Sequence, residues 1–190
     1  MMGGAGVFGI FTFIPFYATS VHKLSTLVSG MILTPRSIGV ISASTITSFL
    51  LKRWGYRRPM VVGMALISLS TFLLAGQGFQ LIEMMGFHLG VAEILAILIM
   101  IRGIGNGIAL PASNNACIEL MPEKVATITG LRGMFRSVGG AVGISIITII
   151  LHLSSSPVNG FKITFLSFGL CLLFTIPLVF LMPTGRKGDG

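Results

Sequence analysis

The sequence predicts an all-α polytopic membrane protein, a single domain of six transmembrane helices over residues 1–190. Two observations carry this prediction. First, 53% of the residues are hydrophobic, only 9% are charged and the mean hydropathy is +0.95, whereas soluble domains carry about 25% charged residues. Second, apolar runs of roughly 20 residues, each long enough to cross ~30 Å of hydrocarbon as a helix, alternate with short polar segments.

The first predicted span, residues 3–21, contains Tyr17 in a phenylalanine-rich run. Two interpretations stay open for these aromatic side chains: a wall that contacts lipophilic cations through cation–π interactions, or packing against lipid. The second span, residues 27–51, is rich in the small residues that let helices approach closely in lipid. Midway along it, Pro35 predicts a kink, and Arg36 follows near half depth.

A strongly basic loop, residues 52–59, joins the second span to the third, residues 60–76. The fourth span is predicted for residues 91–111, ending at Pro111. It carries Arg102, and its second half combines small residues with an amide, which is typical of close helix packing around polar groups. These residues are Gly103, Gly105, Asn106 and Gly107.

The fifth span, residues 126–151, has Arg132 and Arg136 in its first turns, from which we expect them to snorkel to the inner surface. Further along, three glycines are interpreted as helix-packing positions: Gly139, Gly140 and Gly143. The sixth span covers residues 162–182.

The net charge of +8 is distributed unevenly over the predicted loops. Cytoplasmic loops collect Lys and Arg, so this bias explains the basic composition without a nucleic-acid partner. The sequence therefore predicts a multi-pass protein of the cell membrane, in contact with the lipid bilayer, with both termini cytoplasmic. The cytoplasmic side would hold Lys52, Arg53, Arg57, Arg58, Lys124, Arg186 and Lys187, and the external side Lys23 and Lys162.

Arg36 and Arg102 require an explanation, because an arginine at the centre of a membrane helix is unfavourable by at least ~2.5 to 3.5 kcal/mol. One interpretation is that they line a substrate pathway or pair with a carboxylate in a proton-coupling network. The other is that they lock the bundle by hydrogen bonds to helix carbonyls. Asn106 is a further candidate for the pathway.

Several strings resemble a known family. The loop from Leu51 to Arg58 resembles the Asp-Arg-x-Gly-x-Arg-Arg-like loop signature of the major facilitator superfamily. Residues 33–39 are similar to the Leu-x-Pro-Arg-x-x-Gly string of its drug/proton antiporters of the EmrB/QacA type. Residues 101–111 are similar to the Arg-Gly-x-Gly-x-Gly…Pro run of that group, and residues 130–143 to its glycine-rich next helix.

This resemblance implies the C-terminal half of a carrier that exports small lipophilic or cationic molecules by proton antiport and alternating access. It also implies a conformational gate formed by Lys52, Arg53, Gly55, Arg57 and Arg58. Lys52 stands where the superfamily loop usually has aspartate. The loop therefore lacks the carboxylate that would pair with its arginines as an ionic latch.

No Asp or Glu lies deep in a predicted span, so the proton-coupling acid of such a carrier would belong to a half outside this chain. Two alternatives stay open: a small transporter or channel formed by two copies, and a truncated product that does not transport. The sequence has no nucleotide-binding loop, metal-ligand cluster or catalytic triad pattern, so we expect neither an enzyme nor a cofactor or metal.

Overall fold

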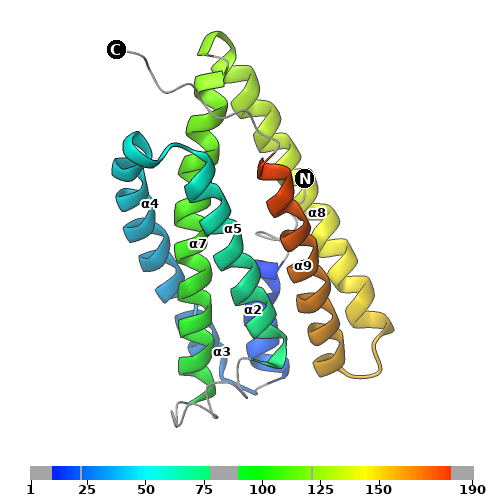
Figure 1. The fold of residues 1–190 in the computed structure, drawn as a ribbon. Coiled ribbons are helices and arrows are strands. Elements are labelled where there is room, and N and C mark those ends of the chain that lie inside the picture. The colour runs from blue at the N-terminus through cyan, green and yellow to red at the C-terminus, as the bar shows by residue number, and fades with distance from the viewer. Residues whose placement is uncertain (1–9, 22, 78–89, 121, 181–190) are drawn as a thin grey trace.

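The structure, a computed structural model, describes residues 10–21, 23–77, 90–120 and 122–180, which form an all-helical bundle (Figure 1). The predicted start of the first span, the linker after the third span and the C-terminal tail lie outside these residues. The helices are α2 (Ile10–Ser20), α3 (Thr26–Met31), α4 (Thr34–Trp54), α5 (Arg57–Phe72), η2 (Leu73–Gln77), α7 (Val91–Leu120), η3 (Pro122–Lys124), α8 (Val125–Leu153) and α9 (Pro157–Phe180).

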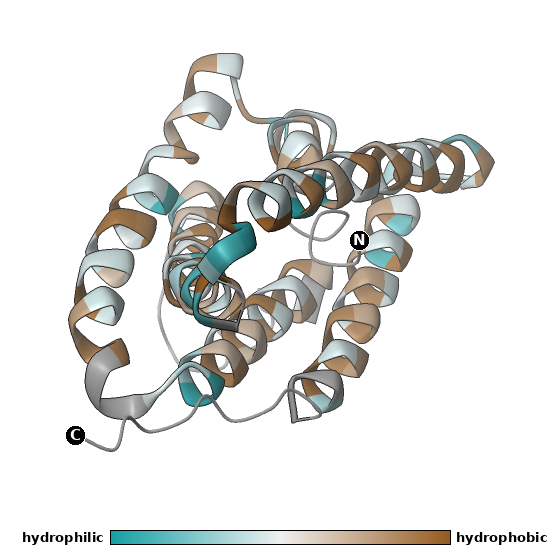
Figure 2. Cartoon of the chain, turned by 90° about the horizontal axis from the view of Figure 1, so that it is seen from above, coloured by the Kyte–Doolittle hydropathy of each residue, from teal (hydrophilic) through white to brown (hydrophobic). Residues whose placement is uncertain are grey.

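Five helical segments among the described residues are long and apolar enough to cross a membrane: Thr26–Leu51, Arg57–Ala75, Val91–Glu119, Pro122–Leu153 and Pro157–Pro177. Viewed from one end, the helices carry apolar residues along their lengths (Figure 2). The described part of α2 has 11 residues, which is shorter than a membrane crossing requires. The predicted all-α membrane bundle is confirmed.

The helix carrying Arg36 is interrupted just before its proline. α3 ends at Met31, α4 begins at Thr34, and Pro35 lies in the first turn of α4. Proline fits the first turn because its missing N–H has no intrahelical partner there, whereas inside a helix it would break a hydrogen bond. The interruption places Arg36 at the start of α4, where the sequence predicted a kink within one continuous helix.

α7 is the central helix and packs closely against α4 on one side and α5 on the other. A Cβ atom on Gly103 would lie 2.5 Å from the carbonyl oxygen of Arg36, and one on Gly107 would lie 2.6 Å from a carbonyl oxygen of α4. On the α5 side, a Cβ on Gly105 would lie 2.8 Å from the carbonyl oxygen of Gly63. Only glycine permits these backbone contacts, as is usual where helices pack in lipid.

α7 continues past Pro111 to Leu120, nine residues beyond the predicted end of the span. The proline removes one backbone hydrogen bond, but ending the helix at that depth would leave several polar backbone groups unsatisfied in an apolar environment. The extension carries Glu119 to the end of the bundle where α4 and α5 are joined.

Hydroxyl groups join the helices through backbone carbonyls. Ser70 Oγ donates to the Leu98 carbonyl oxygen on α7 at 2.6 Å, and Ser68 Oγ donates to the Gly169 carbonyl oxygen on α9 at 3.0 Å. Both serines are buried, so these hydrogen bonds fix α5 between its two neighbours.

α4 and α8 are the least buried of the long helices. Only 22% of the apolar window of each is buried within the bundle, against 50% for α5 and for α7. Gly139, Gly140 and Gly143 of α8 are buried. An exposed apolar stripe follows α8 at helical spacing, through Leu131, Met134, Val138, Val142, Ile146 and Ile149.

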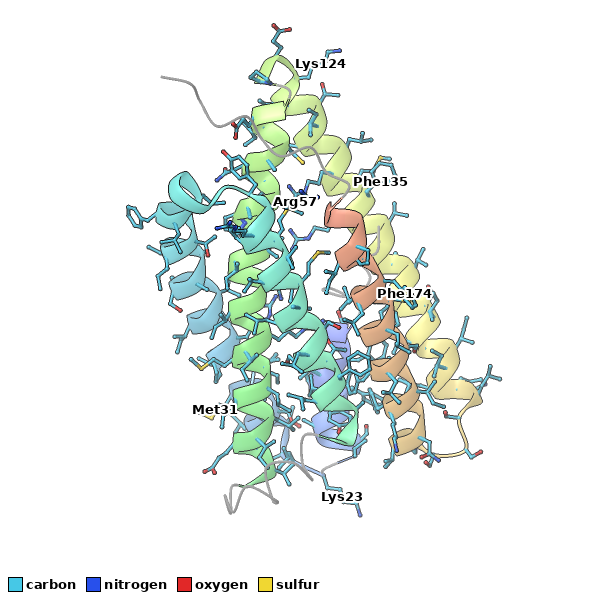
Figure 3. The ribbon with its side chains drawn as sticks, in the orientation of Figure 1. Lys23, Met31, Arg57, Lys124, Phe135 and Phe174 are labelled. Carbon is cyan, nitrogen blue, oxygen red and sulfur yellow. The ribbon has the colours of Figure 1, made fainter. Side chains whose placement is uncertain are left out.

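The turn between α4 and α5 lies at the same end of the bundle as Lys124, and Lys23 marks the opposite end (Figure 3). The first of these ends carries the basic residues of the loop 52–59. The second carries Lys23 and the turn between α8 and α9.

Candidate functional site

The deepest charge in the described bundle is Arg102, whose side chain is 1% exposed. It lies 11 residues into α7, ~17 Å along the helix axis and therefore about half way across a bilayer core. Its Nη1 donates to Thr71 Oγ1 at 2.6 Å, and Thr71 Oγ1 in turn donates to the Ile67 carbonyl oxygen at 2.7 Å. Thr71 thus holds the guanidinium in position without neutralising its charge.

Arg36 is the second charge at this level. Its backbone touches α7 at Gly103, and its guanidinium lies within electrostatic reach of Arg102. The guanidinium carbon stands 4.0 Å from the centroid of the Phe11 ring on α2, a cation–π contact. Its Nε is buried and has no hydrogen-bond partner.

Arg136 of α8 joins these two residues. α8 begins at Val125, so Arg136 lies 11 residues, or about three turns, inside the helix. Its guanidinium is within electrostatic reach of Arg36. The expectation that Arg136 snorkels to the inner surface is therefore replaced by a place beside Arg36. Arg132 lies nearer the end of the bundle, where its Nη1 is 3.9 Å from Cys117 Sγ on α7.

We call Arg36, Arg102 and Arg136 the arginine cluster. The distance of Arg136 from the start of its helix is the sequence signal that could have identified it. The sequence favoured a surface position for Arg136, because arginines in the first turns of a span ordinarily anchor at the membrane surface.

Asn106 lies one turn along α7 from Arg102, on the same helix face. It is 2% exposed, and its amide nitrogen Nδ2 has no hydrogen-bond partner. This nitrogen and Arg36 Nε are both donors, so the group that would satisfy them is an acceptor.

Among the described residues, the chain offers the arginine cluster no carboxylate at its own level. Its five acidic residues are Glu83, Glu93, Glu119, Glu123 and Asp189, all at helix ends or in the segments between and after the helices. Positive charge held at half depth, with unused donors beside it, can bind an anionic group. Ionisable residues at this depth ordinarily mark a substrate or ion pathway.

Tyr17, the fourth pathway candidate, packs against α9. Its ring is 6% exposed and makes edge contacts with Phe161 and Phe165, at centroid distances of 5.0 and 5.2 Å. Phe11, on the same helix as Tyr17, contacts Arg36 of the arginine cluster.

The basic loop forms a second polar site. Gly55 has φ 68°, a left-handed conformation that favours glycine, and it ends α4. Tyr56 is hydrogen-bonded through its side chain to Glu119 of α7. This hydrogen bond raises the pKa of Tyr56, and burial and the negative charge of Glu119 act in the same direction. Arg57 begins α5 and Arg58 is exposed, while the predictions for the side chains of Lys52 and Arg53 lie outside the described residues.

The contact between Tyr56 and Glu119 was missed in the sequence. Because the fourth span was predicted to end at Pro111, Glu119 was placed in a polar break and not on a helix that reaches the loop.

Fold and sites define a polytopic helical membrane protein with a charged centre. The family profile described as Major Facilitator Superfamily matches residues 1–144, three quarters of the chain, and the chain belongs to that superfamily.

The chain is also similar to bacterial transport and resistance proteins. It is 30% identical over 152 residues to the multidrug transporter protein MdtP of Bacillus subtilis, covering 79% of this chain and 26% of the relative. It is 29% identical over 153 residues to a multidrug resistance protein B homolog of Mycobacterium tuberculosis (77% and 26%). It is 25% identical over 145 residues to the colistin resistance protein EmrB of Acinetobacter baumannii (76% and 27%).

The chain thus spans about a quarter of the length of these relatives. No solved structure gave a significant match to it.

Proposed function

We propose that this chain is part of a major facilitator carrier that exports small lipophilic molecules across the cell membrane by proton antiport. The observation that carries the proposal is the arginine cluster at half depth, which is the level where carriers of this architecture bind their cargo. Membership of the superfamily and similarity to proteins named as multidrug transporters support it.

In this proposal the chain supplies one wall of the transport pathway. α4 and α7 form a rigid pair through their glycine contacts, and the wall presents Arg36, Arg102 and Asn106 at its centre. Alternating access would rock this wall against a facing one, so that the central site opens to one side of the membrane at a time.

The facing wall would come from a second six-helix half or from a second copy of this chain. The low burial of α4 and α8, and the apolar stripe on α8, support a further helical partner there. Because no acid lies deep in a predicted span of this chain, the proton-accepting carboxylate would belong to that partner when it is a different half.

The basic loop would form the gate on the cytoplasmic side, with both termini on the same side. The hydrogen bond between Tyr56 and Glu119 would serve as the inner latch in place of the aspartate that Lys52 replaces. The attraction of the basic loop to anionic lipid headgroups fits a cytoplasmic position of this loop.

The test is proton-gradient-dependent efflux of three dyes of different charge: Nile red, ethidium and pyrene-1-butyrate. Cells would express this chain alone or together with the N-terminal half of MdtP. We expect efflux that a protonophore abolishes and that Arg102→Ala reduces at least about tenfold, with Lys124→Ala as the exposed matched control. Absence of efflux of every dye from both kinds of cell contradicts the proposal, and efflux by the chain alone selects the second copy as partner.

A further inference from the structure

The arginine cluster gathers three positive charges inside the helical bundle. Arg36 lies within electrostatic reach of both Arg102 and Arg136, and the helices that carry them supply no carboxylate at that level. Three cations in an apolar environment repel one another, and the repulsion is stronger than in water because the dielectric constant is lower. An anion placed among them removes this repulsion.

The unused hydrogen-bonding atoms beside the cluster specify the same kind of ligand. Arg36 Nε and Asn106 Nδ2 are buried without partners, and both can only donate. A buried donor without an acceptor is unfavourable, so these two atoms favour the binding of an acceptor. A carboxylate fits well, because its two oxygens accept several N–H groups and match a guanidinium in a bidentate pair.

Apolar side chains lie beside the cluster. The Phe11 ring lies against Arg36, and the Ile104 side chain of α7 packs at Gly39, one turn along α4. A small hydrophilic anion would lose its hydration there without gaining apolar contacts. An anion attached to an aromatic or aliphatic body would gain them.

We propose that the arginine cluster and Asn106 bind the carboxylate of the transported molecule, so that lipophilic organic carboxylates are substrates of this carrier. Arg36 and Asn106 provide the free donors, and Arg102, held by Thr71, provides fixed charge at the same level. The inference rests on the proposed function, because it assigns a substrate class to the same pathway.

The experiment measures binding to the purified full chain in an uncharged detergent by equilibrium dialysis. The probes are pyrene-1-butyrate, its methyl ester and pyrene-1-butylamine, which share one apolar body and differ in charge. Micelles without protein give the partition blank. We expect the carboxylate to bind at least about tenfold more tightly than the ester, and the amine to bind more weakly than the ester.

The variants are Arg36→Gln and Arg136→Gln, each checked for an unchanged thermal unfolding temperature, with Lys162→Gln as the exposed control. We expect each cluster variant to lose most of the preference for the carboxylate and the control to keep it. Using two variants keeps the inference testable should one of them fold poorly. Equal binding of carboxylate and ester, or a preference unchanged in both cluster variants, overturns it.

A side-chain carboxylate of a second carrier half would also bind to the arginine cluster, in place of the carboxylate of a transported molecule. When the N-terminal half of MdtP is added, we expect the preference for pyrene-1-butyrate to remain, and its loss would assign the site to a protein carboxylate and overturn the inference. Binding preference without efflux of any dye contradicts the proposed function alone. Efflux without binding preference contradicts the inference alone.

Discussion

The side chain of Tyr56, in the turn between α4 and α5, is hydrogen-bonded to the carboxylate of Glu119, one residue from the end of α7. The contact fastens the basic loop to the central helix. It exists because α7 runs past Pro111, so a single extended helix links the charged centre of the bundle to one of its ends.

The first prediction concerns the titration of Tyr56. Because the phenol donates to a carboxylate, its pKa lies above the ordinary 10.0, and the contact stabilises the fold fully below pH 10 and is lost as the pH rises through the raised value. In a Tyr17→Phe background, which leaves one tyrosine, phenolate ultraviolet absorbance should show this pKa and its decrease toward 10 in Glu119→Gln. Glu123→Gln, at an exposed position, should leave it unchanged. Identical titrations of all three chains would contradict the contact.

Removing the phenol should loosen this end of the bundle. Tyr56→Phe deletes a hydrogen bond to a charged group at a partly solvent-exposed position, where screening leaves it worth about 0.5–1 kcal/mol, so the fraction of molecules open at this end should rise about two- to fivefold. Cys117, half-buried near Arg132, reports the opening in a Cys171→Ala background through its rate of reaction with a charged maleimide. A rate equal to that of the parent chain would count against the latch.

The contact of α4 with α7 should tolerate no side chain at Gly103. Gly103→Ala would place Cβ 2.5 Å from the carbonyl oxygen of Arg36, and separating the helices should cost about 1–3 kcal/mol of stability. Thermal unfolding in detergent measures this loss. Gly130→Ala on α8 is the matched control, since nothing lies within 4 Å of a Cβ there. Equal unfolding temperatures would show that the helices are not in close contact.

The hydroxyl of Thr71 should matter for the burial of Arg102. Thr71→Val keeps the shape but removes the acceptor of Nη1, so we expect a loss of about 1–3 kcal/mol in unfolding free energy. Thr148→Val removes an exposed hydroxyl that bonds only within its own helix, and it should change stability by less than about 0.5 kcal/mol. Equal losses in the two variants would contradict the role of Thr71.

Hydropathy and motif strings predicted the helical membrane bundle and the superfamily, because apolar run length and loop strings are local properties of the chain. The end of α7 was not predicted, because Pro111 is a local helix-ending signal that the apolar environment overrides. Arg36 and Arg102 could each be placed near half depth by counting residues. Their proximity could not be predicted, because it depends on which helices become neighbours.

The place of Arg136 also depends on which helices become neighbours. Its position in the sequence favours a surface anchor, and only the packing of α8 brings it within reach of Arg36. Tyr17 was predicted as part of an aromatic wall, and its ring contacts phenylalanines of α9, a neighbour that the sequence does not specify. The contacts of both residues depend on which helices become neighbours.

The backbone of Arg36 rests directly on Gly103, the residue that follows Arg102 in α7. The main-chain positions from which the two arginine side chains extend are therefore fixed by this contact, and Thr71 holds the guanidinium of Arg102. A site built in this way is preorganised: its geometry exists before any ligand arrives, and it would travel unchanged when the helices move as a unit. Little conformational entropy is then lost on binding, and selectivity depends on charge and shape at fixed positions.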